Sequence, residues 1–128
     1  MEKRCIVSPS GPPAAGPYSH AVAAGDLLFV SGQGPFAQDG SGYTRASFEE
    51  EVRLTLDNLK TVLDDAGSGM DKVVKTTVFL ADMGNFAAFN GVYSQYFASD
   101  PPARTCIQAG RLPLDIQVEI EAIALLSS

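Results

Sequence analysis

The clearest element of the chain is residues 47–67, SFEEEVRLTLDNLKTVLDDAG. Apolar residues recur in it at spacings of three, four and seven, which aligns them along one side of a helix: Phe48, Val52, Leu56, Leu59, Leu63 and Ala66. Ser47 is a typical N-cap, and Glu50 stands three residues on, as in a capping box. Gly67 suits the residue that follows a helix end. The pattern predicts an amphipathic helix over residues 48–66.

Six other segments predict strands, because β-branched and apolar residues are concentrated in them. By residue number they are 1–8, 19–24 and 27–31 before the helix, and 72–80, 104–109 and 116–124 after it. A second helix is expected over roughly residues 84–98, with an apolar stripe formed by Phe86, Phe89, Tyr93 and Phe97. We expect one domain, residues 1–128, of the α+β class: a six-stranded sheet with two helices on one face.

Two helices cover only one face of such a sheet, so the other face raises the question of a partner. Apolar residues such as Ile116 and Val118 are expected on that second face. An apolar sheet face needs a covering surface. Another copy of the same chain is the simplest source of one, which predicts a homo-oligomer.

The composition argues against several classes of function. The net charge of -6 and the scattered Lys and Arg residues disfavour nucleic acid as a partner. The sequence holds no apolar leader and no apolar run of membrane length. Cys5 and Cys106 are expected as free thiols in the cytoplasm. With His20 as the one histidine and no metal-ligand spacing, neither a metal nor a cofactor is expected.

Three polar residues interrupt apolar patterns in the second half of the chain. Asn90 lies on the stripe of the second helix, where a structural hydrogen bond to a nearby loop is the simplest explanation. Arg104 opens a strand and can offer its planar guanidinium to a carboxylate, or form a surface or interface salt bridge. Cys106 shares a strand face with Arg104, and is more easily explained as a small buried residue than as a nucleophile.

The last strand separates an apolar face from a face that carries Glu119 and Glu121. These carboxylates are either solvated, paired with an arginine, or available as a general acid or base that holds a water. If segments 104–109 and 116–121 are neighbours, Arg104 could meet one of them. Tyr18 follows a Pro-rich loop and Ser31 ends a central strand, so either could border a pocket.

These segments resemble the RidA/YjgF family, the reactive-intermediate deaminases, also known as L-PSP endoribonucleases. The resemblance covers nearly the whole chain. Its individual fragments are short, but their order and spacing make it specific. The matching residues are Gly16-Pro17-Tyr18-Ser19, Val30-Ser31-Gly32-Gln33, Leu56-Asp57-Asn58-Leu59, Ala66-Gly67, Lys75 to Leu80, Pro102-Ala103-Arg104, Leu112-Pro113 and Glu119-Ile120-Glu121-Ala122.

The resemblance implies a chorismate-mutase-like fold and a homotrimer with a central barrel-like core and active sites in clefts between subunits. It also implies that Arg104 binds the substrate carboxylate and that Glu119 positions the attacking water. Four further residues fall at positions that line the same cleft in the family: Tyr18, Ser31, Asn90 and Cys106.

The implied activity is cofactor-free hydrolysis of 2-enamine and 2-imine acids, such as 2-aminoacrylate and 2-aminocrotonate, to 2-keto acids and ammonia. Three rival functions stay open: an endoribonuclease or translation inhibitor, a non-catalytic ligand-binding or chaperone-like protein, and an aminomuconate-type deaminase. His20 and Gly34 depart from the family's usual residues. A larger acid needs a roomier pocket, and Gly34 is expected to provide space for it.

Overall fold

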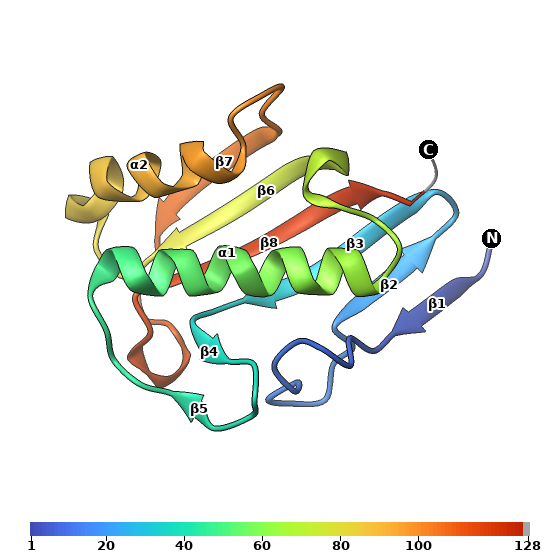
Figure 1. Cartoon of the computed structure of the whole chain (residues 1–128), viewed down its shortest axis with the longest axis horizontal. Helices are drawn as coiled ribbons and strands as arrows, with labels where there is room; N and C mark the ends of the chain where they lie inside the picture. The colour runs from blue at the N-terminus through green and yellow to red at the C-terminus, as the bar shows by residue number, and fades with distance from the viewer. Residues whose placement is uncertain (127–128) are drawn as a thin grey trace.

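Six strands form one mixed sheet in the computed structural model, which describes residues 1–126 (Figure 1). In sequence order they are β1 (Lys3–Ile6), β2 (Ala21–Ala24), β3 (Leu27–Gln33), β6 (Val73–Leu80), β7 (Ala103–Gln108) and β8 (Val118–Leu125). Their order across the sheet is β1-β2-β3-β8-β6-β7. Only β6 and β7 run parallel; the other neighbours are antiparallel. The predicted α+β class and six-stranded sheet are confirmed.

Two helices, α1 (Phe48–Asp65) and α2 (Phe86–Tyr96), pack on the same face of this sheet (Figure 1). Three 3₁₀ turns connect elements: η1 (Met70–Lys72), η2 (Met83–Asn85) and η3 (Pro113–Asp115). A small ribbon of β4 (Phe36–Ala37) and β5 (Gly42–Tyr43) lies where only a loop was predicted. Pairs of two residues are too short to carry a period-two pattern, so the sequence could not indicate them.

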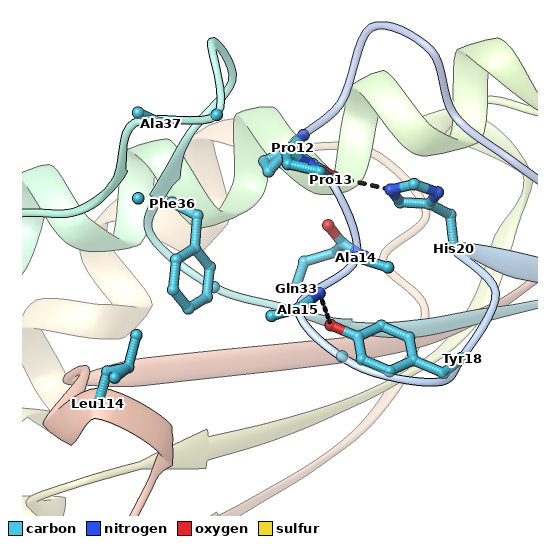
Figure 2. A pocket seen from close by; sticks show the side chains of 14 residues that line it. Pro12, Pro13, Ala14, Ala15, Tyr18, His20, Gln33, Phe36, Ala37 and Leu114 are labelled. Carbon is cyan, nitrogen blue, oxygen red and sulfur yellow. Dashed lines mark hydrogen bonds between the residues drawn. The ribbon is translucent and has the colours of Figure 1, made fainter.

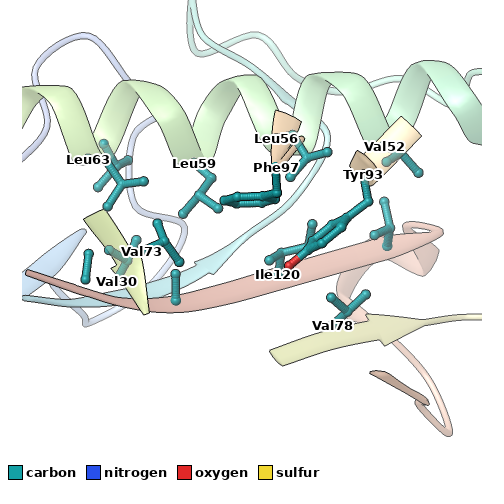
Figure 3. Close-up of a cluster of buried hydrophobic side chains, with 14 of the residues drawn as sticks. Val30, Val52, Leu56, Leu59, Leu63, Val73, Val78, Tyr93, Phe97 and Ile120 are labelled. Carbon is teal, nitrogen blue, oxygen red and sulfur yellow. The ribbon is translucent and has the colours of Figure 1, made fainter. Parts of the chain in front are cut away.

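The ends of α1 form as its sequence predicts. The Glu50 backbone N–H donates to Ser47 Oγ at 3.2 Å, which caps the first turn. At the other end Gly67 takes a positive φ of 85°, which lets the Ser68 N–H reach the Leu63 carbonyl at 2.8 Å. Between these ends the apolar stripe packs onto the sheet and α2 (Figure 3). Each fully buried Leu or Val side chain contributes about 1.5–3 kcal/mol.

The prediction that Ile116 and Val118 lie on the uncovered face is wrong, because Val118 belongs to the core under the helices and Ile116 is buried beside Gly34 before β8 begins. Alternation along β8 points Val118 toward the helices and Glu119 away from them. The uncovered face is nevertheless apolar. The large side chains that it leaves 38–47% exposed are Leu27, Phe29, Ile107 and Leu125.

No helix among residues 1–126 combines the length and the apolar composition needed to cross a bilayer. Both cysteines are free thiols, Cys5 at the surface and Cys106 partly buried.

Candidate functional site

Arg104 lies on β7 and reaches under α2, where it is enclosed by helix side chains. Its Nη1 donates to Asn90 Oδ1 at 2.8 Å. The guanidinium carbon lies 5.5 Å from the ring centre of Phe86 and 5.0 Å from that of Tyr93, within cation–π range. The helical spacing of residues 86, 90 and 93 places all three on the side of α2 that faces β7. The predicted bond of Asn90 to a nearby loop is wrong, because its partner is this guanidinium.

Arg104 has no carboxylate partner within residues 1–126. The ion pairs of this part of the chain are Lys60–Asp64 and Arg111–Asp115, both near the surface. A guanidinium has five N–H donors, and one of those of Arg104 is used by Asn90. The remaining donors form a planar fork that suits a carboxylate. The residue is therefore half-buried, oriented and available for an anion.

Cys106 follows two residues later on the same face of β7. Burial raises the pKa of its thiol, and the positive charge of Arg104 opposes that shift only in part. A thiol is a nucleophile only as the thiolate. The environment therefore fits the prediction that Cys106 borders the site without acting as a nucleophile.

Glu119 occupies the opposite face of the sheet, beside the backbone of β3. Gly32 leaves room for it: a Cβ on Gly32 would overlap Glu119 Oε2 and lie 2.8 Å from its Cδ. Burial raises the pKa of Glu119, and repulsion from the nearby Glu121 raises it further. The Glu119 carboxylate is thus more basic than an exposed one.

Ser31 lies on the same side of the sheet as Glu119, and Tyr18 lies on the loop before β2. Ser31 Oγ donates to the Ser19 carbonyl at 2.6 Å, which ties the end of β3 to the loop that carries Tyr18. The Tyr18 hydroxyl accepts from the Ala15 N–H at 3.1 Å, so the ring is folded back over its own loop (Figure 2). A cavity of about 230 Å³ opens between this loop and the segment after β3, and Gly32 is part of its wall.

The six predicted site residues therefore form two groups on opposite faces of the sheet. The first group lies on the helix-covered side and consists of Asn90, Arg104 and Cys106. Arg104 pairs with Thr76 of β6, which in turn pairs with Ala122 of β8, and both of these partners are buried under the helices. The other group is Ser31 and Glu119, with Tyr18 on the loop that Ser31 contacts. Segments 104–109 and 116–121 are not neighbours, because β6 runs between β7 and β8. One protomer does not bring the two groups together.

Two features of the site were missed or misjudged from sequence. The aromatic enclosure of Arg104 was missed, although Phe86 and Tyr93 share the stripe of Asn90. Gly34 was expected to provide space; it does line the cavity, but the volume that its own side chain would take is used by neighbouring side chains. A Cβ there would lie 2.8 Å from Phe36 Cε2 and 2.9 Å from Ile116 Cδ1, so the ring of Phe36 already fills that space.

The described part of the chain contains no cluster of side chains that could bind a metal ion. No group of three His, Cys, Asp or Glu side chains within residues 1–126 is arranged to hold an ion.

Comparison with known proteins gives consistent matches over nearly the whole chain. The family model described as Endoribonuclease L-PSP matches residues 9–126. A RutC family protein of Pyrococcus abyssi is 39% identical over 97% of this chain and 98% of its own. The crystal structure of YEO7_yeast superimposes with a TM-score of 0.94 at 39% identity, covering 98% of this chain and all of the other.

The third relative is TdcF of Escherichia coli strain K12, which bears the name "putative reactive intermediate deaminase". It is 39% identical over 98% of this chain and 99% of its own. Its crystal structure with bound serine superimposes with a TM-score of 0.90 over 97% of this chain and 99% of the other, at 38% identity.

Proposed function

This chain belongs to the RidA/YjgF family, and from that premise we propose that it hydrolyses 2-imino acids, and the 2-enamine acids that tautomerise to them, to 2-keto acids and ammonia. The simplest such substrates are 2-aminoacrylate and 2-aminocrotonate. The observation that carries the proposal is the half-buried guanidinium of Arg104, oriented by Asn90 and without a carboxylate partner in residues 1–126.

Arg104 would hold the carboxylate of the substrate. Two parallel charge-assisted hydrogen bonds from a guanidinium fix both the position and the plane of a carboxylate. A crystal structure of the relative TdcF holds a bound serine, and serine also carries a carboxylate next to a nitrogen-bearing carbon, which supports a ligand of this kind. Asn90 and the aromatic rings would keep the guanidinium fixed, which lowers the cost of ordering it on binding.

Glu119 would act on the water. Water adds to the electrophilic imine carbon while Glu119 takes one of its protons and passes it to the imine nitrogen, which gives a carbinolamine. The C–N bond of the carbinolamine then breaks as its hydroxyl proton passes through Glu119 to the leaving nitrogen, and the C=O bond forms. The products are a ketone at that carbon and ammonia, so no redox step or cofactor is required. The raised pKa of Glu119, caused first by burial and then by Glu121, makes it a stronger base for this transfer.

The site is proposed to form between two copies of the chain. Arg104 and Glu119 face opposite sides of one sheet, so they can act on one substrate only if they come from different protomers. The exposed apolar side chains on the face of Glu119 supply a surface for such contacts, Phe29 and Ile107 among them. A homotrimer whose sheets enclose a barrel-like core is the assembly that we propose.

The name of the family model raises ribonuclease activity as an alternative. A protein that binds RNA through phosphate contacts needs a basic surface. The chain carries nine Lys and Arg residues against fifteen Asp and Glu, a net charge of -6. That balance counts against RNA as the substrate.

The test is release of keto acid from imines generated in situ by an amino-acid oxidase. Wild type should accelerate release over the spontaneous reaction, and Arg104→Ala should not. Arg53→Ala, a change at an exposed arginine of α1, is the matched control and should behave as wild type. Failure of wild type to accelerate release from any imino acid would contradict the proposal, and cleavage of RNA by the same preparation would favour the alternative.

A further inference from the structure

We infer that the 230 Å³ cavity beside Gly32 receives the side chain of the substrate, and that the preferred 2-imino acids carry branched or aromatic apolar side chains. This inference rests on the proposed function and specifies its substrate class. The cavity lies between the Pro-rich loop and the segment around β4 (Figure 2).

The size of the cavity is the first argument. A closed apolar cavity of about 150 Å³ is large enough to take up benzene. At about 230 Å³ this cavity is larger than a phenyl group needs. The methyl group of the smallest imino acid would leave most of it unfilled, and unfilled volume forfeits contact energy. A side chain the size of those of leucine or phenylalanine fits better.

The chemistry of the wall is the second argument. The cavity lining is mainly apolar and includes Pro13, Ala15, Phe36 and Leu114. Two polar groups of the wall already take part in bonds within the protein: the Gln33 amide nitrogen donates to the Ser31 carbonyl at 3.0 Å, and the Tyr18 hydroxyl accepts from the Ala15 N–H at 3.1 Å. A polar substrate side chain would lose its hydration and gain few partners from this mainly apolar lining. The wall therefore selects apolar groups.

Position is the third argument. Gly32 borders the cavity and is also the residue whose missing side chain makes room for Glu119. An imine carbon held near Glu119 would therefore have its side chain directed past Gly32 into the cavity. The reacting atoms and the specificity pocket meet at this one glycine.

Buried polar side chains hold the backbone of the cavity wall in place by hydrogen bonds. Asn58 Nδ2 donates to the carbonyls of Gly34 and Phe36, each at 2.8 Å, which anchors the β4 side to α1. On the other side, His20 contacts the Ser8 N–H at 3.1 Å and the Pro12 carbonyl at 2.7 Å. A pocket held in this way discriminates by size, because its wall cannot collapse around a small group.

The experiment compares substrates in wild type and in Ala15→Leu. Ala15 lines the cavity but is exposed, so leucine there fills the cavity without disturbing the core. Imines of alanine, 2-aminobutyrate, leucine and phenylalanine are generated in situ, and kcat/KM is measured for each. Ala98→Leu, at an exposed alanine just after α2, is the matched control.

Wild type should prefer the leucine and phenylalanine imines over the alanine imine by at least about tenfold. Ala15→Leu should remove that preference by slowing the large substrates alone, and Ala98→Leu should keep it. Equal or better activity on the alanine imine would overturn this inference while leaving the proposed function intact.

Binding of the keto-acid products separates the two proposals further. By calorimetry, phenylpyruvate should bind wild type more tightly than pyruvate, and Ala15→Leu should abolish the difference. This result without deamination of any imine would support the pocket and contradict the proposed function. Equal binding of the two keto acids would overturn the inference that the cavity receives the substrate side chain.

Discussion

Arg104 and Glu119 project from opposite faces of a single sheet, on strands that β6 separates. Each has the features of half an active site: an oriented cation without a carboxylate partner in residues 1–126, and a carboxylate whose pKa burial raises. A substrate that needs both must lie between two protomers. The geometry of one chain thus makes a prediction about the assembly.

Mixing two inactive variants should restore activity. Arg104→Ala and Glu119→Gln should each be inactive alone, because each removes one half of every site. In mixed oligomers, some sites would combine the intact Glu119 of one variant with the intact Arg104 of the other. Random assembly at equal amounts should restore about a quarter of wild-type activity, because a site is intact only when one protomer is the Glu119→Gln variant and its neighbour is the Arg104→Ala variant.

The measurement is keto-acid release after the two variants are refolded together. Variants that are refolded separately and then mixed are the control. No recovery in the co-refolded sample would place both residues in one protomer's site.

Asn90 should act through Arg104 rather than on the substrate. Asn90→Ala removes one hydrogen bond to the guanidinium and should lower kcat/KM about tenfold, mainly through KM. Asn90→Asp should be worse, because the new carboxylate would pair with Arg104 and occupy the donors meant for the substrate. Steady-state kinetics of the two variants provide the comparison. An Asp variant as active as the Ala variant would argue against this positioning role.

Local pattern predicted the helices and the two faces of β8 well. The stripe of α1, the Ser47 cap and the Gly67 end involve residues within one turn or one helix, where spacing alone fixes the geometry. The division of β8 into an apolar and a carboxylate face follows from strict alternation. The candidate residues were therefore identifiable, although their roles came from a family resemblance.

What could not be predicted was non-local. Whether β7 pairs with β6 or with β8 depends on the packing of the whole sheet, and the site is divided by that choice. Gly34 looked like open space, but the chain turns so that Phe36 fills it. Ile116 precedes β8 and is buried after a turn in which Leu114 and Asp115 both have positive φ. No pattern in the sequence signals that turn.

Glu119→Gln should stabilise the fold at neutral pH even as it removes activity. Because burial and Glu121 raise the pKa of Glu119 in the folded state, the folded protein keeps its proton to higher pH than the unfolded chain does. Ionising Glu119 thus lowers the free energy of unfolding as the pH rises through the pKa of Glu119 in the unfolded chain and then in the folded protein. Urea unfolding should show a higher midpoint for the Gln variant at pH 8, with the difference vanishing below about pH 4.

The control for this pH dependence is Glu2→Gln, a change at an exposed glutamate of the N-terminus. Its unfolding midpoint should follow that of wild type at every pH. A Glu119→Gln variant that is less stable than wild type at pH 8 would contradict the assignment of a raised pKa.

Glu51 should be a structural carboxylate, although its place in the first turn of α1 suggests only a favourable dipole interaction. It is 1% exposed, and its Oε2 accepts from the Tyr43 hydroxyl, the Ala46 N–H and the Gln117 amide at 2.7–3.1 Å. Its Oε1 accepts from the Gln117 N–H at 3.2 Å. Glu51→Gln puts an NH₂ group opposite one of these sets of donors. The free energy of unfolding should fall by about 2–3 kcal/mol.

The exposed neighbour Glu50 provides the control for this change, since Glu50→Gln should alter the free energy of unfolding by less than about 0.5 kcal/mol. Urea denaturation measures both. Equal effects of the two substitutions would mean that the bonds of Glu51 add nothing beyond the helix dipole.

His20 should be replaceable by Gln but not by Leu. Its Nδ1 accepts the Ser8 N–H, so the ring must carry its proton on Nε2, which donates to the Pro12 carbonyl. The Gln side chain ends in one acceptor and one donor group and can satisfy the same two partners. Leu fills similar volume and satisfies neither, leaving a buried N–H and a carbonyl unpaired at a cost of about 2 kcal/mol. Thermal unfolding of both variants measures this cost.

The kcat/KM for the larger imino acids should fall only in the His20→Leu variant, because the loop that walls the cavity loses its anchor. Since the chain has one histidine, the imidazole signals in a nitrogen-correlated NMR spectrum report the tautomer of wild type directly, and a proton on Nδ1 would contradict this account.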